Sequence, residues 1–232
     1  MAVRSVYLPE LQIQDNRVRI DGDEHRHLTV ARAAPNEVIE IFNGRGTAWM
    51  GIVESVGKRE TVARVTERRE IQPEPVALIL GLAMIRIAAF ELALEKVVEI
   101  GVTRIIPFTA ERSNVAPGHR LERWQRIVIE AAKQSKHYHL PVLESATSFE
   151  QVISISATSK ILFAEREGGS LKSALAGSPV LYLIGPEGGW TDRELSTARD
   201  RGFHAVSLGA AILKAETAAI VATSLIRYDL AK

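Results

Sequence analysis

Two patterns of hydrophobic and polar residues divide the chain. In the first third, apolar and polar positions alternate over short runs, most clearly at residues 17–20, 38–42 and 61–65. Alternation at a period of two with β-branched residues is typical of strands that bury one face. Turn signals such as Asn43-Gly44 follow these runs closely. The pattern predicts a small, mostly antiparallel β barrel or sandwich.

One helix is expected inside this β-rich part, at residues 24–33, where Asp23 is placed to cap the first turn. The β-rich part ends at Pro73-Glu74-Pro75, a stiff extended stretch that is typical of a linker. We therefore expect one domain at residues 1–72 and a second at residues 73–232.

After the linker the pattern becomes that of a parallel α/β domain. Residues 76–80 form a continuous apolar run of the kind that a parallel sheet buries on both faces. Strands then alternate with helices, and Thr191 with Glu194 forms a capping box before one of them. Further strands are expected at 103–108, 160–164, 180–184 and 205–208, and helices at 90–100, 121–136, 191–201 and 215–230.

Composition narrows the class of protein. The 232 residues are 46% hydrophobic and 25% charged, which is ordinary for a soluble globular protein. The longest apolar stretch, residues 76–85, is about half as long as a membrane span, and no basic-then-apolar leader follows Met1. We therefore expect a cytoplasmic protein without a membrane partner. The absence of Cys excludes disulfides, zinc thiolate sites and cysteine nucleophiles.

Charge leaves the question of an RNA partner open. The formal net charge is only +1, far from that of a strongly basic nucleic-acid binder. Of the 29 basic residues, however, 21 are Arg and 8 are Lys. Arg suits contacts with phosphates and bases, although a GC-rich genome would give the same bias.

Two Gly-containing loops carry most of the candidate chemistry. The first, Ile-Gly-Pro-Glu-Gly-Gly at 184–189, leads from an apolar strand into the helix capped by Thr191. Ligands of open α/β sheets bind at the carboxyl ends of strands, and glycines let a ligand approach the backbone. The second, 208–218, places Lys214 and Glu216 where a loop becomes a helix. Taken alone, the first loop is also explained by a tight turn, and the second by a solvated surface Lys214 and a first-turn charge at Glu216.

Taken together, the two loops resemble those of a known family. The chain is similar over essentially its whole length to the RsmE-type 16S rRNA (uracil-N3)-methyltransferases of the SPOUT superfamily. The similarity rests on 184–189 followed by Thr191-Asp192-x-Glu194, on Leu208-Gly209 followed by 212–218, and on Glu95-Lys96, 99–102, 111–113, 122–124, Glu130-Ala131 and Gln134-Ser135. His27-Leu28 with Ala31-Arg32 resembles the family's small PUA-like domain.

This resemblance implies a fold, a cofactor and partners. It implies a C-terminal SPOUT α/β domain with a parallel sheet and a deep trefoil knot, behind an N-terminal β-rich PUA-like RNA-binding domain. Three loops would bind S-adenosyl-L-methionine, and a homodimer would complete the site. The reaction implied is methylation of N3 of a uridine in the 16S rRNA of the small ribosomal subunit, with no metal required.

The resemblance also implies site residues, carried over one by one. The cofactor-binding residues would be Phe163, Ala164, Glu165, Ile184, Gly185, Pro186, Glu187, Gly188, Leu208, Gly209, Ile212, Leu213, Ala215, Thr217 and Ala218. The catalytic residues would be Lys214, Glu216 and Arg112, and the RNA-binding residues Arg26, His27, Arg32 and Arg86. The chain departs from the family pattern at Lys214, where Arg is usual, at Ala211, at His137, and at Arg86-Ile87, where Lys-Gly is usual.

From the residues alone, two other functions remain alternatives. One is a non-catalytic RNA-binding factor with a degenerate cofactor site, against which the intact pair of loops argues. The other is a Rossmann-type enzyme with another nucleotide, against which the missing dinucleotide and P-loop fingerprints argue. His25-Arg26-His27 and His137-Tyr138-His139 each lack a third ligand nearby, so no metal site is expected.

Overall fold

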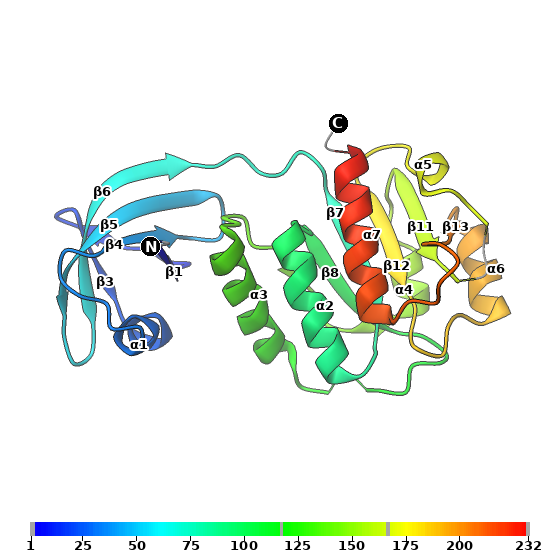
Figure 1. Ribbon diagram of the computed structural model, residues 1–232, viewed down its shortest axis with the longest axis horizontal. Coiled ribbons are helices and arrows are strands. Elements are labelled where there is room, and N and C mark those ends of the chain that lie inside the picture. The colour runs from blue at the N-terminus through cyan, green and yellow to red at the C-terminus, as the bar shows by residue number, and fades with distance from the viewer. Residues whose placement is uncertain (1–2, 117, 166–167, 231–232) are drawn as a thin grey trace. The chain divides into compact units, whose positions relative to one another are not determined.

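Figure 1 shows the computed structural model of the chain, which describes residues 3–116, 118–165 and 168–230. The chain packs into two units. The first holds the residues up to Pro73 together with Ala132–Leu140, and the second holds Glu74–Ala131 together with the residues from Pro141 onward. The domain boundary after residue 72 stays a prediction. The return of Ala132–Leu140 to the first unit is a feature that the strand and helix patterns did not reveal.

The first unit is built around a mixed sheet with the strand order β1-β4-β5-β6-β3-β2. β1 pairs with β4 in parallel, and the other described neighbours are antiparallel. Its elements are β1 (Arg4–Tyr7), β2 (Ile13–Gln14), β3 (Arg17–Ile20), α1 (Gly22–Val30), β4 (Val38–Phe42), β5 (Thr47–Val56) and β6 (Thr61–Glu70). Val6, Ile20, Ile39 and Ile41 are buried in one core with Leu28 of α1. The predicted β-rich, mostly antiparallel domain is confirmed.

Helix α1 begins earlier than predicted. Asp21 occupies its N-cap position without a side-chain cap hydrogen bond, and Asp23 lies inside the first turn. The predicted cap at Asp23 was therefore wrong, because the first helical bond already joins the His25 N–H to the Asp21 carbonyl at 3.1 Å. β5 was missed because three successive residues at its start, Thr47, Ala48 and Trp49, are all buried, which hides the alternation.

The second unit is a parallel sheet covered by helices (Figure 1). The strand order is β10-β8-β7-β12-β11-β13, with β9 beside β8, and all described pairs are parallel. The strands are β7 (Leu78–Ala83), β8 (Arg104–Thr109), β9 (Val142–Leu143), β10 (Thr147–Ser148), β11 (Ser159–Phe163), β12 (Val180–Ile184) and β13 (His204–Val206). The helices are α2 (Ile87–Ile100), α3 (Leu121–Ser135), α4 (Phe149–Ile153), α5 (Leu171–Ala174), α6 (Asp192–Asp200) and α7 (Ala215–Leu230). The predicted parallel α/β domain is confirmed.

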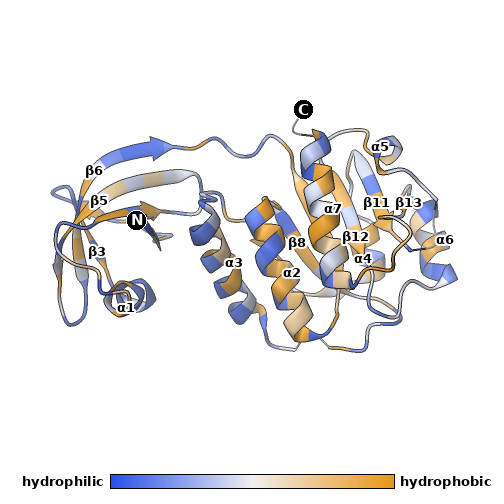
Figure 2. Cartoon of the chain, in the orientation of Figure 1, coloured by the Kyte–Doolittle hydropathy of each residue, from blue (hydrophilic) through white to orange (hydrophobic). Residues whose placement is uncertain are grey.

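The central strands are apolar because both of their faces are covered. Every residue of β7 and β12 is buried, and these strands are hydrophobic in Figure 2. Tyr182 of β12 points to α7, where its hydroxyl lies 2.8 Å from that of Thr223. Leu181 and Leu183, on the opposite face by strand alternation, pack in the cluster that contains Phe149 of α4. Alternation is therefore absent, as a doubly covered sheet requires.

Strand β7 extends past the predicted end of its apolar run. The strand was expected at residues 76–80, whereas β7 continues through Gly81 to Ala83. A Cβ on Gly81 would lie 2.3 Å from Cδ2 of Leu183 on the neighbouring strand. The glycine is therefore required by side-chain packing and does not mark a turn.

A buried carboxylate fixes the returning segment Ala132–Leu140 within the first unit. Glu40 of β4 is 4% exposed and accepts hydrogen bonds from Lys136 Nζ (2.9 Å), the Tyr138 hydroxyl (2.8 Å) and Arg69 Nη2 (2.7 Å). Burial raises the pKa of Glu40, but the hydrogen bonds from Lys136 and Tyr138 and the charges of Lys136 and Arg69 outweigh it, so the pKa is lowered. Burial and the bond to Glu40 raise the pKa of Tyr138 to about 12.

Glu40→Gln tests this network through the pH dependence of stability. The folded-state pKa of Glu40 lies below its ordinary value of 4.5. The ionised carboxylate therefore stabilises the fold above that pH, and its contribution is lost as the pH falls through the folded-state pKa. We expect the variant to be less stable by about 1–3 kcal/mol at neutral pH and the deficit to shrink in acid. Urea unfolding measured from neutral pH to about pH 3, with the exposed Glu10→Gln as control, checks this; a deficit that does not change with pH contradicts it.

Candidate functional site

The carboxyl ends of three neighbouring strands lie side by side in the second unit. Phe163, the last residue of β11, pairs with Ile184, the last of β12, and with Val206, the last of β13. The Ala164 N–H also donates to the Val206 carbonyl at 2.9 Å. Since all three strands are parallel, the segments that follow them leave the same edge of the sheet. The sequence-predicted cofactor residues lie on these segments, at the strand ends or, for Ala215, Thr217 and Ala218, in the first turn of the helix that follows the third segment.

The segment after β12, residues 185–190, is called the middle loop here. Its turn is closed by the Gly189 N–H, which donates to the Pro186 carbonyl at 2.9 Å, and Gly189 has a φ of +68°. Pro186 is buried, whereas Glu187 and Gly188 are exposed. The predicted capping box of Thr191 and Glu194 is confirmed at the start of α6.

Arg112 contacts the middle loop from the turn after β8. Its guanidinium Nη1 donates to the carbonyls of Gly188 (3.0 Å) and Trp190 (3.2 Å). A Cβ on Gly188 would lie 3.0 Å from Cβ of Arg112. The glycine therefore allows the two segments to approach closely, and the arginine predicted to be catalytic lies at this contact.

Arg86 and Glu187 connect the middle loop to the start of α2. The backbone N–H of Arg86 donates to Glu187 Oε1 at 3.1 Å, and the Arg86 guanidinium Nε lies 3.4 Å from the same oxygen. Glu187 thus binds an amide at the N-cap of α2, where a carboxylate is favourable. Glu187 was predicted to contact the cofactor and Arg86 to contact RNA, and the structure brings the two together.

The segment after β13, residues 207–214, is called the third loop here. Its Gly209 has a φ of +123°, and a Cβ there would meet no atom within 4 Å. Ile212 is 77% exposed, while Leu208 and Leu213 are half-buried. The loop therefore presents backbone and an apolar side chain to open space.

Lys214 and Glu216 lie at the start of α7. The Lys214 carbonyl accepts the first helical hydrogen bond from the Ala218 N–H at 2.8 Å, and Glu216 is in the first turn. Ala215 is buried and Thr217 is exposed. Within the described part of the chain, the Lys214 ammonium and the Glu216 carboxylate make no hydrogen bond or ion pair. Both groups are thus available to a ligand.

The segment that starts at Ala164, directly after β11, is called the first segment here. Phe163 is buried, Ala164 half-buried and Glu165 exposed. Farther along, Gly169 bridges to Val206, and a Cβ on Gly169 would lie 2.1 Å from the Ala205 carbonyl oxygen. This first segment therefore runs close beside β13.

The other predicted RNA-binding residues belong to the first unit. Arg26 is paired with Asp23 at 2.9 Å. His27 is exposed, with its Nδ1 3.3 Å from Lys133 Nζ. Arg32 is exposed just after α1, with a φ of +55°. These residues lie on α1 or directly behind it and thus form one local group.

Sequence reasoning missed Trp190 as a functional candidate. Its indole Nε1–H donates to the Phe163 carbonyl at 2.8 Å, which joins the middle loop to the end of β11. Glu194 was recognised only as a capping residue, yet its carboxylate also accepts the Glu111 N–H at 2.9 Å. The capping box was the one local signal for this part of the site.

Two parts of the chain match known protein families. Residues 72–227 match a family described as RNA methyltransferase domain, and residues 20–66 match one described as RNA methyltransferase PUA domain. These two matches, to the parts of the chain that form a parallel α/β sheet and a β-rich domain, define the class of the protein as an RNA methyltransferase with a PUA domain. The fold class implied by the sequence resemblance is confirmed.

Individual relatives narrow this class. The chain is 33% identical to ribosomal RNA small subunit methyltransferase E of Synechocystis sp., over 96% of this chain and 76% of that protein. It is 29% identical to the protein of the same name from Rickettsia conorii, over 98% and 96%. A crystal structure of ribosomal RNA small subunit methyltransferase E from Neisseria gonorrhoeae, bound to S-adenosyl methionine, superposes with a TM-score of 0.92 at 30% identity and covers 99% of this chain and 98% of that one. The chain therefore belongs to the ribosomal RNA small subunit methyltransferase E family.

Arg112→Ala is expected to loosen the middle loop without unfolding the protein. The variant loses the two hydrogen bonds to Gly188 and Trp190. We expect amide hydrogen exchange in peptides covering residues 185–191 to accelerate about threefold to tenfold, the equivalent of roughly 1 kcal/mol of local stability. The matched control is Arg201→Ala, which removes an exposed arginine at the far end of α6. Unchanged exchange in Arg112→Ala means that the arginine does not hold the loop.

Proposed function

We propose that this protein transfers a methyl group from S-adenosyl-L-methionine to N3 of a uridine in the 16S rRNA of the small ribosomal subunit, in the cytoplasm. The observation that carries the proposal is the in-register alignment of Phe163, Ile184 and Val206, which gathers the three family loops at one edge. Membership in a family of RNA methyltransferases and the cofactor bound in the Neisseria relative support it.

The residues present fit this cofactor. Gly209 leaves open space beside its backbone, so that a ligand can approach main-chain amides closely. Exposed Ile212 and half-buried Leu208 and Leu213 offer apolar surface to an adenine ring. We propose that the three loops bind the cofactor through the fifteen residues named in the sequence analysis, from Phe163 to Ala218. When bound, the cofactor would supply an electrophilic sulfonium methyl carbon for the uracil N3, with the thioether S-adenosylhomocysteine as the leaving group.

Lys214 and Glu216 are the proposed catalytic residues. Uracil N3 must lose its proton, and an unpartnered carboxylate such as that of Glu216 is a suitable acceptor. The Lys214 ammonium would stabilise the negative charge that develops on the base oxygens. Lys214 has the positive charge of the arginine usual in the family, but it offers a compact ammonium in place of a planar guanidinium. Arg112, whose guanidinium contacts the middle loop, acts in this proposal by positioning that loop.

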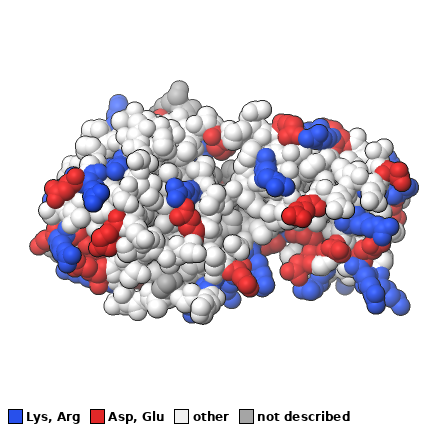
Figure 3. Space-filling model, turned by 180° about the vertical axis from the view of Figure 1, so that it is seen from behind, with Lys and Arg blue, Asp and Glu red and all other residues white. Residues whose placement is uncertain are grey.

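RNA docking is assigned to Arg26, His27 and Arg32 of the first unit, with Arg86 in the second. On the face shown in Figure 3, basic and acidic side chains lie beside one another, and the net charge is only +1. Docking would therefore rest on individual phosphate contacts. Arg32 is exposed and its side chain has no described partner, which makes it available to a phosphate.

A homodimer formed through α7 completes the proposal. The sequence alone predicts that the apolar face of this helix at Ile220, Leu225 and Ile226 forms the dimer contact, but Ile226 is fully buried within its own chain. Leu225 (42% exposed) and Tyr228 (66% exposed) are the large apolar side chains that α7 presents to solvent. A two-fold pairing of these residues would cover them.

Among the described residues, no helix is both long and apolar enough to cross a membrane.

A ligand panel tests the cofactor assignment. Because a ligand that binds only the folded state raises its melting temperature, S-adenosylhomocysteine at about 100 times its Kd should stabilise the protein by about 2.7 kcal/mol. NAD and ATP at the same concentration should leave the melting temperature unchanged. Stabilisation by NAD alone would identify a different nucleotide enzyme, and no stabilisation by any of the ligands would favour an RNA-binding factor without a cofactor.

Lys214→Ala separates catalysis from binding. The loss of an interaction that is stronger in the transition state should lower kcat by about 10²-fold or more and leave the Kd values of cofactor and RNA nearly unchanged. Arg32→Ala should instead weaken RNA binding and reduce its salt dependence by about one phosphate contact. Mass spectrometry of nucleosides from small-subunit RNA that lacks the modification reports both effects. Normal turnover by Lys214→Ala, or a product other than 3-methyluridine, contradicts the assignment.

A further inference from the structure

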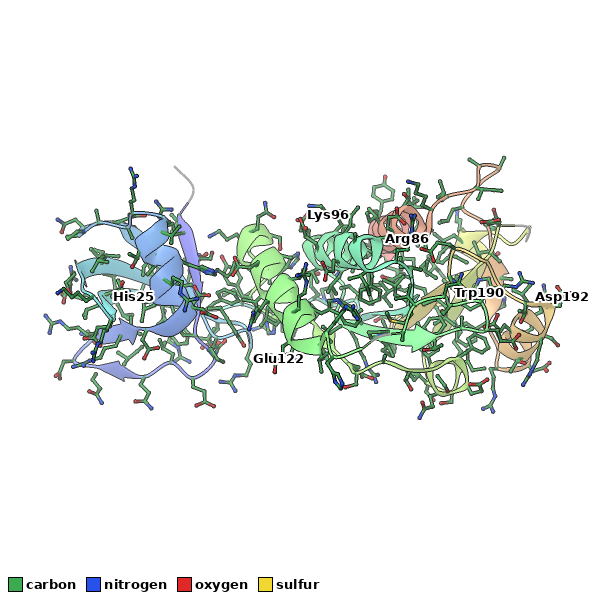
Figure 4. All side chains as sticks on the ribbon, turned by 90° about the horizontal axis from the view of Figure 1, so that it is seen from below. His25, Arg86, Lys96, Glu122, Trp190 and Asp192 are labelled. Atoms are coloured by element: carbon green, nitrogen blue, oxygen red, sulfur yellow. The ribbon has the colours of Figure 1, made fainter. Side chains whose placement is uncertain are left out.

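Trp190 lies where the segments around the proposed cofactor site meet. It ends the middle loop, and Figure 4 shows it beside the strands, with Asp192 farther out at the start of α6. Its side chain is half-buried. The neighbouring sequence does not predict this burial, because Trp190 follows two glycines and precedes the helix cap Thr191. Its contacts reach three different strand ends.

The first contact is the hydrogen bond from Nε1 to the Phe163 carbonyl, 2.8 Å long. Phe163 is the last residue of β11, so this bond holds the point at which the first segment leaves the sheet. The second contact is with Gly185, the first residue after β12, where a Cβ would lie 2.8 Å from Cε2 of the indole. The ring therefore covers the start of the middle loop.

The third contact is with aromatic rings at the end of β8 and the start of α4. The indole is nearly parallel to the ring of Phe108, at 8° and 6.1 Å between centroids, and is tilted against Phe149 at 5.6 Å. Both phenylalanines are buried in the core of the second unit. Trp190 thus packs against the buried core on one side and donates a hydrogen bond to the end of β11 on the other.

Glu194 provides a second link of the same kind. Its carboxylate is 2% exposed and accepts hydrogen bonds from the Thr191 N–H (2.9 Å), the Thr191 hydroxyl (3.1 Å) and the Glu111 N–H (2.9 Å). One carboxylate therefore joins the end of the middle loop to the turn after β8 that carries Arg112. An ordinary capping box requires only the contacts with Thr191.

We propose that Trp190, assisted by Glu194, is a positioning residue that fixes the spacing between the first segment and the middle loop for cofactor binding. This inference rests on the proposed function. Loops held in the bound arrangement before the ligand arrives lose less conformational entropy on binding. The loss of Trp190 Nε1–H should therefore weaken cofactor affinity through the loops, without removing a group that reacts.

Trp190→Phe is the critical variant, and Trp124→Phe is its matched control. The phenyl ring retains apolar packing on Phe108 and removes the bond to Phe163. Trp124 is also buried and stacked on a phenylalanine, Phe90, but its Nε1 has no hydrogen-bond partner in the described structure. The same chemical change thus removes a hydrogen bond at one site and none at the other.

The measurements are the Kd for S-adenosylhomocysteine by calorimetry and kcat at saturating S-adenosylmethionine. For Trp190→Phe we expect the Kd to rise about threefold to tenfold, as for one lost hydrogen bond. Its kcat should stay within about twofold of the parent, because at saturating S-adenosylmethionine nearly all molecules have the loops in the cofactor-bound arrangement. Trp124→Phe should change neither value. If Trp190 only stabilised the fold, Trp190→Phe would lower the melting temperature but would not raise the Kd at constant kcat.

Equal affinities of the parent and Trp190→Phe overturn the proposal, as does an equal loss of affinity in both tryptophan variants. If Trp190→Phe does not melt cooperatively, Glu194→Gln replaces it, with the adjacent exposed Asp192→Asn as control. Glu194→Gln should raise the Kd by a similar factor, and an unchanged Kd overturns the proposal in that case too. Failure of the proposed function is a different result, since the parent protein itself would then not bind S-adenosylhomocysteine.

Discussion

Parallel pairing of buried strands, with their last residues in register, is the constraint on which the site depends. Phe163, Ile184 and Val206 end three adjacent strands at the same level. A shift by one residue would turn every side chain to the other face of the sheet, so that Tyr182 would lose Thr223 of α7, and Leu181 and Leu183 would leave the cluster that contains Phe149. Every segment that follows these strands must therefore start at one edge, whatever its own sequence. The loops are brought together by the sheet and not by attraction between them.

Crowding at this edge explains the residue types found there. Gly185 lies under the Trp190 indole, and Gly188 lies against Arg112, so both positions exclude a side chain for reasons of space. Polar groups that face inward are bonded across segments, as in the contact between Glu194 and the Glu111 N–H. Lys214 has no described partner. Among the described residues, this edge thus combines side chains held by contacts between segments with the Lys214 ammonium, which is available to a substrate.

The first unit depends on a different interaction. The chain leaves it after Pro73, returns for Ala132–Leu140 and leaves it again, and the buried carboxylate of Glu40 binds the returning segment through Lys136 and Tyr138. Burying a carboxylate is costly unless it is paired and hydrogen-bonded, and here the side chains of Ser5, Arg69, Lys136 and Tyr138 donate to it. The chain therefore passes between the two units three times.

Local patterns in the sequence determined the class of fold and the elements nearest the site. The apolar run of β12, the capping box of Thr191 and Glu194, and helix α7 were predicted because each depends on residues close together in the chain. Only the tertiary structure revealed the bonds between Trp190 and Phe163, Glu194 and Glu111, and Lys136 and Glu40, whose partners are 27, 83 and 96 residues apart. Periodicity and turn signals predict which face of an element is buried. Strand order and register determine which side chain a residue on that face contacts. For that reason the sequence identified the loops of the site, and the folded chain alone decided which side chains hold them in place.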